Sequence, residues 1–587
     1  MKIVCLVKQV PAVGAIEFDE ETKTLKRECV PLELNAFDRY AVAHGAALRN
    51  AADGEVVAMT MGPPQAEEVL RECLSLGADR AVHLSDRAFA VADTLGTSRT
   101  LSLALRKEGA DVVLCGRKTL DSETWQVPPE VAGFLDWPHL TNVLAIELED
   151  GRLRVTRATD EGEEIYEVGP PVVLSVSLPP GDEAESRDGP IQVWQAADLV
   201  SDLAPNDKRF GQTGSPTRVL AVRDSRPERR GFQTESVEEA KRAIGELLAE
   251  RAPEQSSWEK PGHIAERPGA TYDCWSVVEL AGGRPRRVSL ELLARGRELA
   301  GKLGGRNVAL LIGHDLDAAV SELAHHGAEV IHTAEDPALA DYHPELWAAV
   351  LRRVLTEQRP HVVLIPATAR GRDFGPRAAG ELELGMTGDC VGVDIVKAGR
   401  LLQQKPAFGG NIVSVIMGST TPQLATVRPR MYEPLEPRDD AEAEVRQLPL
   451  DRLPEPRARL VERSASDGGA ELEEADVVVC AGPGVDRDEV ETLAAQEGVA
   501  VGGSRGSAFP PGRQIGLLGR PVAPRVLVAL EGPGDDEQLS GFVKAGVVVA
   551  LAVDAGSPML SAADVGLTGD WHETLPPLQE AVSKAMR

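Results

Sequence analysis

Short apolar, β-branched runs alternate with helix-like stretches along most of this chain, and that alternation limits its fold more than any other feature. Strands that alternate with helices of about 10–15 residues are typical of a parallel sheet with helical crossovers. The first part of the chain is therefore predicted to be a doubly wound α/β domain. Its expected strands lie at 2–7, 55–61, 81–84 and 111–115, and its expected helices at 36–50, 64–76 and 91–108.

The same alternation returns in the middle of the chain. Gly77-Ala-Asp79 precedes the run Val112-Val-Leu-Cys-Gly116 by the same interval as Gly327-Ala-Glu329 precedes Val362-Val-Leu-Ile-Pro366. This echo favours two related doubly wound domains, and chance similarity between two such sheets is the alternative. The expected strands here are 307–312, 329–332 and 361–366, and the expected helices are 290–303, 315–326 and 344–357.

Two polar stretches divide the chain further. Residues 251–270 are rich in Pro, Ser and charge, as linkers are, and they follow a helical pattern at 236–250 that Ser236 caps. Residues 436–473 are polar and acidic and precede a last α/β unit. Its expected strands are 476–481, 525–530 and 547–552, and the predicted units of the whole chain are 1–250, the linker 251–270, 271–445 and 446–587.

Composition excludes several classes of function. A chain of 587 residues is too long for one core, so several domains are expected. The formal charge of −29 is spread along the sequence, which argues against nucleic acid and anionic membranes as partners. No apolar run approaches the roughly 20 residues of a membrane span, and the start MKIVCLVKQV lacks the basic flank of a signal peptide. A cytoplasmic protein without a membrane insertion is therefore expected.

Residue types that carry catalysis are not arranged for it. The seven cysteines contain no CxxC pair and several lie in apolar runs, so buried reduced thiols are expected rather than a metal site or disulfides. The eleven histidines follow no spacing pattern, and no Ser-His-Asp, metal-ligand or paired-carboxylate constellation stands out. The sequence does not indicate a substrate-converting enzyme.

One loop has the character of a nucleotide site. Gly116 ends an expected strand and opens the sequence GRKTLDSETWQVPP. At the carboxyl edge of a parallel sheet, a loop with exposed N–H groups before a helix suits a phosphate. A simple strand-to-helix turn without a ligand is the alternative.

Two sets of strings stand out along the chain. The first set consists of Met1-Lys-Ile-Val-Cys-Leu-Val-Lys-Gln-Val-Pro11, Leu34-Asn-Ala-Phe-Asp38, Gly116-Arg-Lys-Thr-Leu-Asp121 and Phe134-Leu-Asp-Trp-Pro138. The second set consists of Lys405-Pro-Ala-Phe-Gly-Gly-Asn411, Ala425-Thr-Val-Arg-Pro429, Gly502-Gly-Ser-Arg505 and Gln514-Ile-Gly516. Taken together, the first set resembles the small, beta subunit of an electron-transfer flavoprotein, and the second set resembles its large, alpha subunit. Because these subunits are normally separate chains, the resemblance implies fused beta and alpha subunits, a pseudo-heterodimer in one chain.

The resemblance implies a nucleotide, AMP or a second FAD, in the beta-like domain. Many members with AMP have Asn-Gln-Thr-Gly where this chain has Trp125-Gln-Val-Pro128, which is closer to the Ala-Gln-Val-Gly-Pro of the other branch. The choice between AMP and FAD stays open. The matching positions are Leu6, Lys8, Asn35, Gly62, Gly116, Asp121, Gln126 and Val127.

The resemblance also implies a redox-active FAD in a C-terminal α/β FAD-binding domain, on a middle domain that serves chiefly as base and interface. A guanidinium near the flavin would stabilise its anionic reduced forms. The matching positions are Ser504, Arg505, Gln514, Ile515, Gly516, Gly519, Gln538 and Asp570.

The same C-terminal region departs from the family. Pro483 stands in place of an arginine-bearing segment, Leu518 in place of a hydroxyl residue, and Ala552 in place of an Asn beside the phosphates. An acidic group at an expected helix start would repel a pyrophosphate. Its members are Glu531, Asp535, Asp536 and Glu537.

The implied function is electron transfer through FAD, from a dehydrogenase to a quinone-linked or iron-sulfur oxidoreductase. One alternative is a bifurcating flavoprotein with two FADs and NADH oxidation of its own. Another is a nucleotide-binding scaffold whose flavin site has decayed. Between Leu178 and Trp194 the usual docking segment for acyl-CoA dehydrogenases is not recognisable, which implies a different partner.

Overall fold

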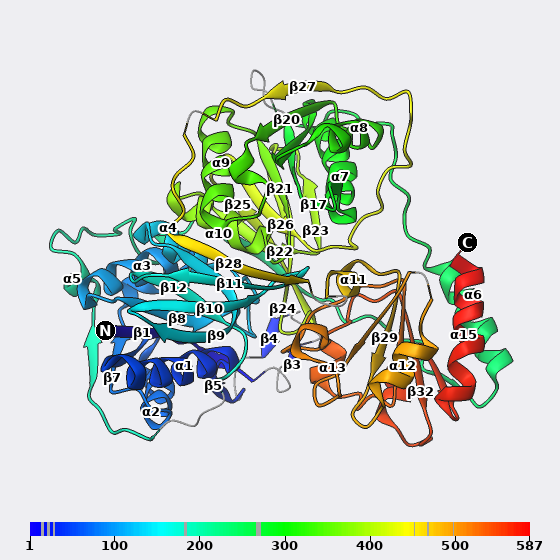
Figure 1. The fold of residues 1–587 in the computed structure, drawn as a ribbon, viewed down its shortest axis with the longest axis horizontal. Coiled ribbons are helices and arrows are strands. Elements are labelled where there is room, and N and C mark those ends of the chain that lie inside the picture. Colours follow the sequence, from blue (N-terminus) through cyan, green and yellow to red (C-terminus); the bar gives the residue numbers. More distant parts are fainter. Residues whose placement is uncertain are drawn as a thin grey trace.

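Three lobes make up the molecule, and each is built on its own sheet (Figure 1). We call them the N-terminal domain (blue to cyan), the middle domain (green to yellow) and the C-terminal domain (orange to red). The computed structural model describes residues 1–587 apart from 13–16, 20–23, 27–29, 181–184, 266–271, 451, 466–468, 497 and 587.

The N-terminal domain contains a largely buried parallel sheet. Helices cover both faces of this sheet, so its strands are buried on both sides and consist largely of Val, Ile and Leu. Two antiparallel strands, β10 (Arg152–Ala158) and β11 (Gly162–Val168), extend it beyond β9. The parallel order is β13 (Ile191–Trp194), β7 (Arg80–Leu84), β6 (Glu55–Met61), β1 (Lys2–Leu6), β8 (Val112–Gly116), β12 (Val172–Val176) and β9 (His139–Glu149). Its helices are α1 (Ala36–Ala52), α2 (Glu67–Ser75), α3 (Thr94–Glu108) and α4 (Val127–Leu135).

The middle domain repeats this topology. When only the seven parallel strands of each sheet are numbered along the chain, both sheets have the same order, 7-3-2-1-4-6-5. The predicted pair of related doubly wound domains is confirmed. The order is β27 (Glu444–Gln447), β20 (Val330–Glu335), β19 (Asn307–Gly313), β16 (Cys274–Val278), β21 (Val362–Pro366), β26 (Gln423–Val427) and β22 (Met386–Cys390). Its helices are α7 (Arg287–Leu303), α8 (Asp317–His325), α9 (Pro344–Glu357) and α10 (Gly371–Glu381).

The C-terminal domain contains a third parallel sheet. Helix α15 (Trp571–Met586) covers one face together with α6 (Val237–Glu250), whose N-cap Ser236 accepts a hydrogen bond from Glu239 as predicted. The third α/β unit predicted from the sequence is therefore present. Its strand order is β15 (Phe232–Thr234), β33 (Val565–Thr568), β32 (Val547–Ala552), β31 (Val526–Leu530), β29 (Val477–Ala481) and β30 (Val499–Gly503).

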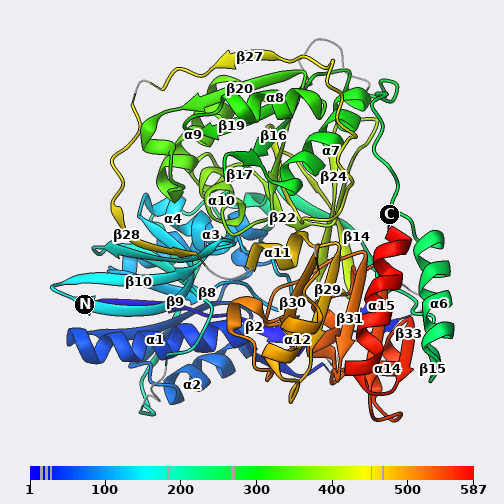
Figure 2. The same cartoon turned by 45° about the vertical axis from the view of Figure 1, so that its right-hand side comes forward.

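Segments from each half of the chain complete sheets in the other half. Strand β15 and helix α6 lie before the linker, yet they pack against β33 and α15, and Figure 2 shows α6 beside the red C-terminal helix. Strand β14 (Thr217–Asp224) joins the hairpin strand β25 (Ile412–Gly418) of the middle domain. In return, β28 (Ala458–Ala465) pairs with β11 in the first sheet. Each of the three domains therefore contains segments from both sides of a boundary that was drawn from the sequence, at residue 250 or at residue 446.

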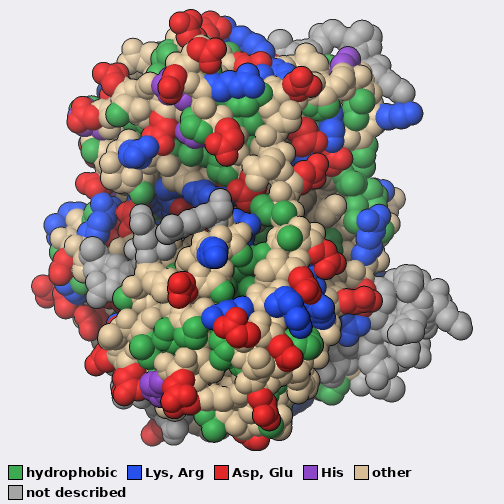
Figure 3. Space-filling view, turned by 90° about the vertical axis from the view of Figure 1, so that its right-hand side faces the viewer, with side chains coloured by type: hydrophobic (Ala, Val, Ile, Leu, Met, Phe, Trp, Pro, Cys, Tyr) green, Lys and Arg blue, Asp and Glu red, His purple; other side chains and the backbone are tan. Residues whose placement is uncertain are grey.

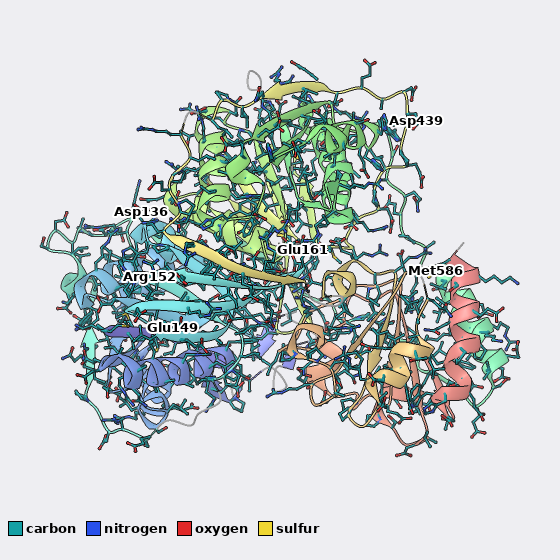
Figure 4. The ribbon with its side chains drawn as sticks, viewed as in Figure 1. Asp136, Glu149, Arg152, Glu161, Asp439 and Met586 are labelled. Atoms are coloured by element: carbon teal, nitrogen blue, oxygen red, sulfur yellow. The ribbon has the colours of Figure 1, made fainter. Side chains whose placement is uncertain are left out.

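Buried ion pairs also hold the domains together. Arg157 and Asp373 have fully buried side chains, and Arg157 Nη1 lies 2.9 Å from Asp373 Oδ2 across the boundary between the N-terminal and middle domains. At the point where all three lobes meet, Asp160 lies within 3.0 Å of Arg286 and 3.5 Å of Arg520. Its neighbour Glu161, labelled in Figure 4, pairs with Arg370.

The surface is acidic but mixed. Figure 3 shows Asp and Glu side chains scattered over one whole face with Lys and Arg among them. None of the helices in the described ranges combines the length and the apolar character that crossing a bilayer needs. Six cysteines are free and buried, whereas Cys29 lies outside the described residues.

We predict that the chain can be cut in the linker without falling apart. A protease site inserted after Ala265 should give two fragments that still elute as one particle, because β14, β15 and β28 each pair across the cut. Size-exclusion chromatography checks this, with a denaturing gel to prove cleavage. Two separate peaks in the absence of denaturant would contradict it.

Candidate cofactor sites at the carboxyl edges of two sheets

The first candidate site lies where β6, β1 and β8 end side by side. These strands are parallel neighbours, so Gly62, the residues after Leu6 and Gly116 meet at one edge. Asp38 of α1 organises this edge: its two carboxylate oxygens accept the backbone N–H groups of Lys8 at 2.9 Å and Gly116 at 3.0 Å. A Cβ at Gly116 would lie 2.5 Å from Asp38 Oδ1, so this position requires glycine.

The protonation of Asp38 is set by its burial. Burial raises the pKa of its carboxyl to about 7, against the lowering effect of its hydrogen bonds. Sequence reasoning quoted Asp38 only as part of a string and missed this role. The available signal was an acidic residue three positions after Asn35, at the start of an expected helix.

The loop after Gly116 is folded by its own contacts. Asn35 donates to Lys118 O at 3.0 Å and accepts from Leu120 N at 3.1 Å, so it shapes the loop. Lys8 Nζ lies 2.6 Å from Asp121 Oδ2. Although burial raises the pKa of Asp121, Lys8 outweighs this, and the net pKa lies below its usual value. The other oxygen, Oδ1, is buried without a hydrogen-bond partner, so it could accept a donor from a ligand.

The end of this loop faces the middle domain. Gln126 donates to Met386 O at 3.1 Å and accepts from Gly388 N at 2.9 Å, so both ends of its amide serve the domain interface. Val127 begins α4, but Pro128 and the proline after it have no N–H to give a phosphate. Four of the eight predicted nucleotide positions therefore use their side chains to shape the loop or to hold it against the middle domain. They are Lys8, Asn35, Asp121 and Gln126.

Trp125 occupies the centre of this interface. It adopts φ of 62° and is 8% exposed, and its Nε1 is buried without a partner. Three cations lie over its ring, at 4.7 Å for Arg372, 5.1 Å for Arg117 and 5.6 Å for Lys118. The indole thus fills the space beside the loop and is held by cation–π contacts.

The second candidate site lies at the carboxyl edge of the C-terminal sheet. Ser504 follows β30 directly, and its hydroxyl is fully buried without a hydrogen-bond partner. Arg505 beside it is exposed. Gln514 donates to Phe509 O at 3.0 Å, and Ile515 is anchored in the core, so both hold the following turn in place. An unpartnered hydroxyl next to an exposed guanidinium fits the polar edge of a flavin ring.

The turn at 516–519 is clamped from the N-terminal domain. Arg117 donates through Nη2 to Leu518 O at 2.7 Å and to Gly519 O at 2.9 Å. Burial first, and then Arg520 and Arg372, lower the pKa of Arg117 to about 9. The residue after Gly116 therefore links the two candidate sites. Sequence reasoning missed it, because the contact joins residues far apart in the chain.

Carboxylates fill the middle of the second site. Glu531 accepts Val553 N at 2.8 Å, Asp535 accepts Gln538 N at 2.9 Å, and Glu537 accepts Leu518 N at 3.3 Å. A Cβ at Gly516 would lie 2.6 Å from Glu537, and burial raises the pKa of that carboxyl. These carboxylates occupy N–H groups that would otherwise be free to bind an anion at this edge.

The last two predicted residues are also engaged. Gln538 is fully buried and accepts Gly534 N at 2.9 Å, so it braces the loop after β31. Asp570 is exposed after β33, and its Oδ1 lies 2.6 Å from His572 Nδ1. His572 in turn lies 3.1 Å from Glu489. Ser504 and Arg505 thus leave polar atoms for a ligand at one end of the site, whereas Asp570 at the other end is paired with His572 and three carboxylates hold N–H groups between the two ends.

The middle domain contributes contacts to both sites. Gly409 donates its N–H to Glu123 Oε1 at 2.7 Å, and a Cβ at Gly409 would lie 2.3 Å from Ser540 Oγ. Arg377 donates to Trp137 O at 2.6 Å. The turn of the KPAFGGN string therefore lies between the N-terminal and C-terminal domains.

Comparison with known proteins agrees with this arrangement. A family model described as "Electron transfer flavoprotein domain" matches residues 22–199 and again 274–453, which together exceed half of the chain. The chain belongs to the electron transfer flavoprotein family. The predicted fusion is confirmed, because two different subunits match different halves of it.

Both subunits of one organism are among these relatives. The alpha subunit of the electron transfer flavoprotein of Thermoanaerobacterium thermosaccharolyticum is 32% identical over 323 residues, covering 53% of this chain and 98% of the relative. The beta subunit is 39% identical over 260 residues, covering 43% of this chain and 99% of the relative. The "Caffeyl-CoA reductase-Etf complex subunit CarD" of Acetobacterium woodii is 39% identical over 230 residues, covering 38% of this chain and 86% of the relative.

Proposed function

We propose that this flavoprotein is an electron carrier, and not a substrate-converting enzyme, with its redox-active FAD at the carboxyl edge of the C-terminal sheet. The observation that carries the proposal is the pair Ser504 and Arg505, an unpartnered buried hydroxyl beside an exposed cation. Ser504 would hydrogen-bond the flavin ring, and Arg505 would favour its anionic reduced forms. Asp570 would hold the adenosine end.

The partners are proposed by analogy with the relatives. One relative is named as a subunit of a caffeyl-CoA reductase complex, and another as an acryloyl-CoA reductase electron transfer subunit. We propose a dehydrogenase as donor and a quinone-linked or iron-sulfur oxidoreductase as acceptor. The cytoplasm is the proposed location.

The N-terminal domain would hold a second ligand, AMP or FAD. Supporting observations are the free acceptor Asp121 Oδ1 and the edge formed by Lys8 and Gly116. The second candidate function, a bifurcating protein with two FADs and NADH oxidation of its own, is favoured by the sequence Trp125-Gln-Val-Pro128 and by the match to CarD.

We predict that the purified chain is yellow and carries one FAD in the C-terminal domain. Release of bound nucleotides, followed by chromatographic counting of FAD and AMP per chain, checks this. One FAD with AMP supports the carrier, and two FADs support the bifurcating alternative. A colourless protein that takes up no FAD on titration would reject both, and would favour a nucleotide-binding scaffold with a decayed flavin site.

Ionisation of Asp38 should control nucleotide affinity in the N-terminal domain. Below its pKa of about 7 the carboxyl is neutral, and above it a negative charge faces a bound phosphate across Lys8 N and Gly116 N. AMP binding should therefore weaken by about tenfold from pH 6 to pH 8. The folded chain binds this proton more tightly than the unfolded chain, so folding stability also falls as the pH rises through 7.

The control is Asp38→Asn, which removes the charge and keeps the size of the side chain but can accept only one of the two N–H groups, so the comparison is made between pH profiles and not between affinities at one pH. Titration calorimetry with AMP should give a flatter pH profile in this variant, since only the second ionisation of the phosphate remains. Equal profiles in both proteins would place the nucleotide elsewhere.

A further inference from the structure

A crevice lies between the middle and C-terminal domains. Lys544 and Val522 line it from segments that precede β32 and β31, which is the amino side of the C-terminal sheet. Arg372, Arg428 and the turn at Gly409 line it from the middle domain. It encloses about 440 Å³ of space, part of which is open to solvent.

Lys544 is a cation without a counter-ion. Among the described residues no carboxylate lies within ion-pair distance of its ammonium, although the side chain is only partly exposed. Burial lowers the pKa of Lys544, and the nearby charge of Arg428 lowers it further. A half-buried cation that faces another cation is unfavourable unless an anion lies between them.

The middle-domain wall is also short of negative charge. Asp389 is shared between Arg372, at 2.6 Å, and Arg428, at 2.5 Å, and the only other carboxylate paired with Arg428 among the described residues is Glu123, at 3.7 Å. The Arg372 side chain is 9% exposed, and its Nε is buried without a hydrogen-bond partner. Glu473 lines the crevice from α11 (Gly469–Glu474) of the C-terminal domain but is bonded to Arg520 at 3.1 Å. In a chain with a formal charge of −29, this local excess of cations is unusual.

We propose that this crevice binds one small oxyanion of the phosphate type, which joins Lys544 of the C-terminal domain to Arg372 and Arg428 of the middle domain. Guanidinium groups match the oxygens of phosphate, and an ammonium adds a point charge. The three cations supply donors and charge for one phosphate-type group, so the ligand we propose is the inorganic ion. Its binding would hold the two domains together and does not depend on the identity of either cofactor.

Equilibrium dialysis with labelled inorganic phosphate tests the proposal, at constant ionic strength maintained with chloride. The test compares the full chain with Lys544→Gln, Lys544→Arg and the matched control Lys584→Gln, which removes an exposed lysine from α15. We expect Lys544→Gln to weaken binding at least tenfold. We expect Lys544→Arg and Lys584→Gln to bind as the native chain does. Circular dichroism verifies that each variant is folded.

Thermal unfolding in phosphate gives a second readout. Phosphate stabilises proteins generally by exclusion from their surface, and that effect acts on every variant equally. Binding at the site is therefore measured as a saturable rise in Tm that the native chain shows in addition to this general effect and that Lys544→Gln does not show. Equal dialysis curves and equal Tm rises for Lys544→Gln and Lys584→Gln would overturn the proposal. Displacement of the labelled phosphate by AMP in the native chain, but not in Lys544→Gln, would also overturn the proposal. The ligand would then be the phosphate group of a larger molecule.

Discussion

Replacing Arg157 by Met should lower the free energy of unfolding by about 3–5 kcal/mol, the cost of leaving a buried charge without its partner. Arg157 and Asp373 are fully buried where the N-terminal and middle domains meet. Burial raises the pKa of Asp373, but Arg157 and His139 lower it more, so this carboxylate is charged in the native protein. Urea unfolding followed by fluorescence measures the loss.

The double variant Arg157→Met with Asp373→Asn is the decisive control. It removes both charges and keeps an amide that Tyr342, now 2.9 Å from Asp373 Oδ2, can still contact. Because no charge is then left buried alone, the double variant should recover part of the lost stability. A double variant no more stable than Arg157→Met would show that packing, and not charge, explains the loss.

Replacing Asp535 by Ser and Glu537 by Gln should tighten FAD binding about tenfold. Each carboxylate holds an N–H group at the edge where the pyrophosphate would lie, and like charges in a partly screened site repel by about 1 kcal/mol per close contact. Ser keeps the cap of the short helix after Asp535, so folding is little affected. Fluorescence titration of the apoprotein with FAD measures the dissociation constant.

Salt dependence separates this effect from others. FAD binding to the native chain should tighten as salt rises, because screening weakens the repulsion, and the double variant should lose that trend. Asp336→Ser is the matched control, since Asp336 caps a turn of the middle domain in the same way. An unchanged dissociation constant in the double variant would mean that the pyrophosphate lies away from Asp535 and Glu537.

Much of the fold could be predicted because its signals are local. Alternating apolar runs located some strands of each sheet to within a few residues, for example 55–61 for β6 and 547–552 for β32, whereas β12, β16 and β33 were not predicted. Ser236 and Glu239 marked the start of α6 through a hydrogen bond between neighbours. Such features depend on residues close in sequence, where hydrophobic periodicity and the conformational preference of each residue determine the local structure.

The rest depends on contacts between distant residues. Strands β14, β15 and β28 pair with strands far away in the chain, and nothing in their own residues says which sheet they will join. Gln126 matched a nucleotide-binding position, yet its amide is used by Met386 and Gly388 of another domain. The clamp from Arg117 to Leu518 likewise joins residues about 400 positions apart. Motifs therefore indicated two sheet edges as candidate sites, whereas the partners of their side chains required the structure.

The first half of the chain contributes β14, β15 and α6 to domains of the second half, and the second half contributes β28 to the N-terminal domain. This arrangement has a consequence for the synthesis of the protein. The arm formed by residues 217–250 leaves the ribosome long before β33 and α15, so its strand edge and its apolar helix face must wait for the end of synthesis. Unpaired edges and exposed apolar faces favour aggregation. A truncated product would keep that arm permanently uncovered. Joining the two halves in one reading frame supplies every arm with its own partner in equal amount and at high local concentration.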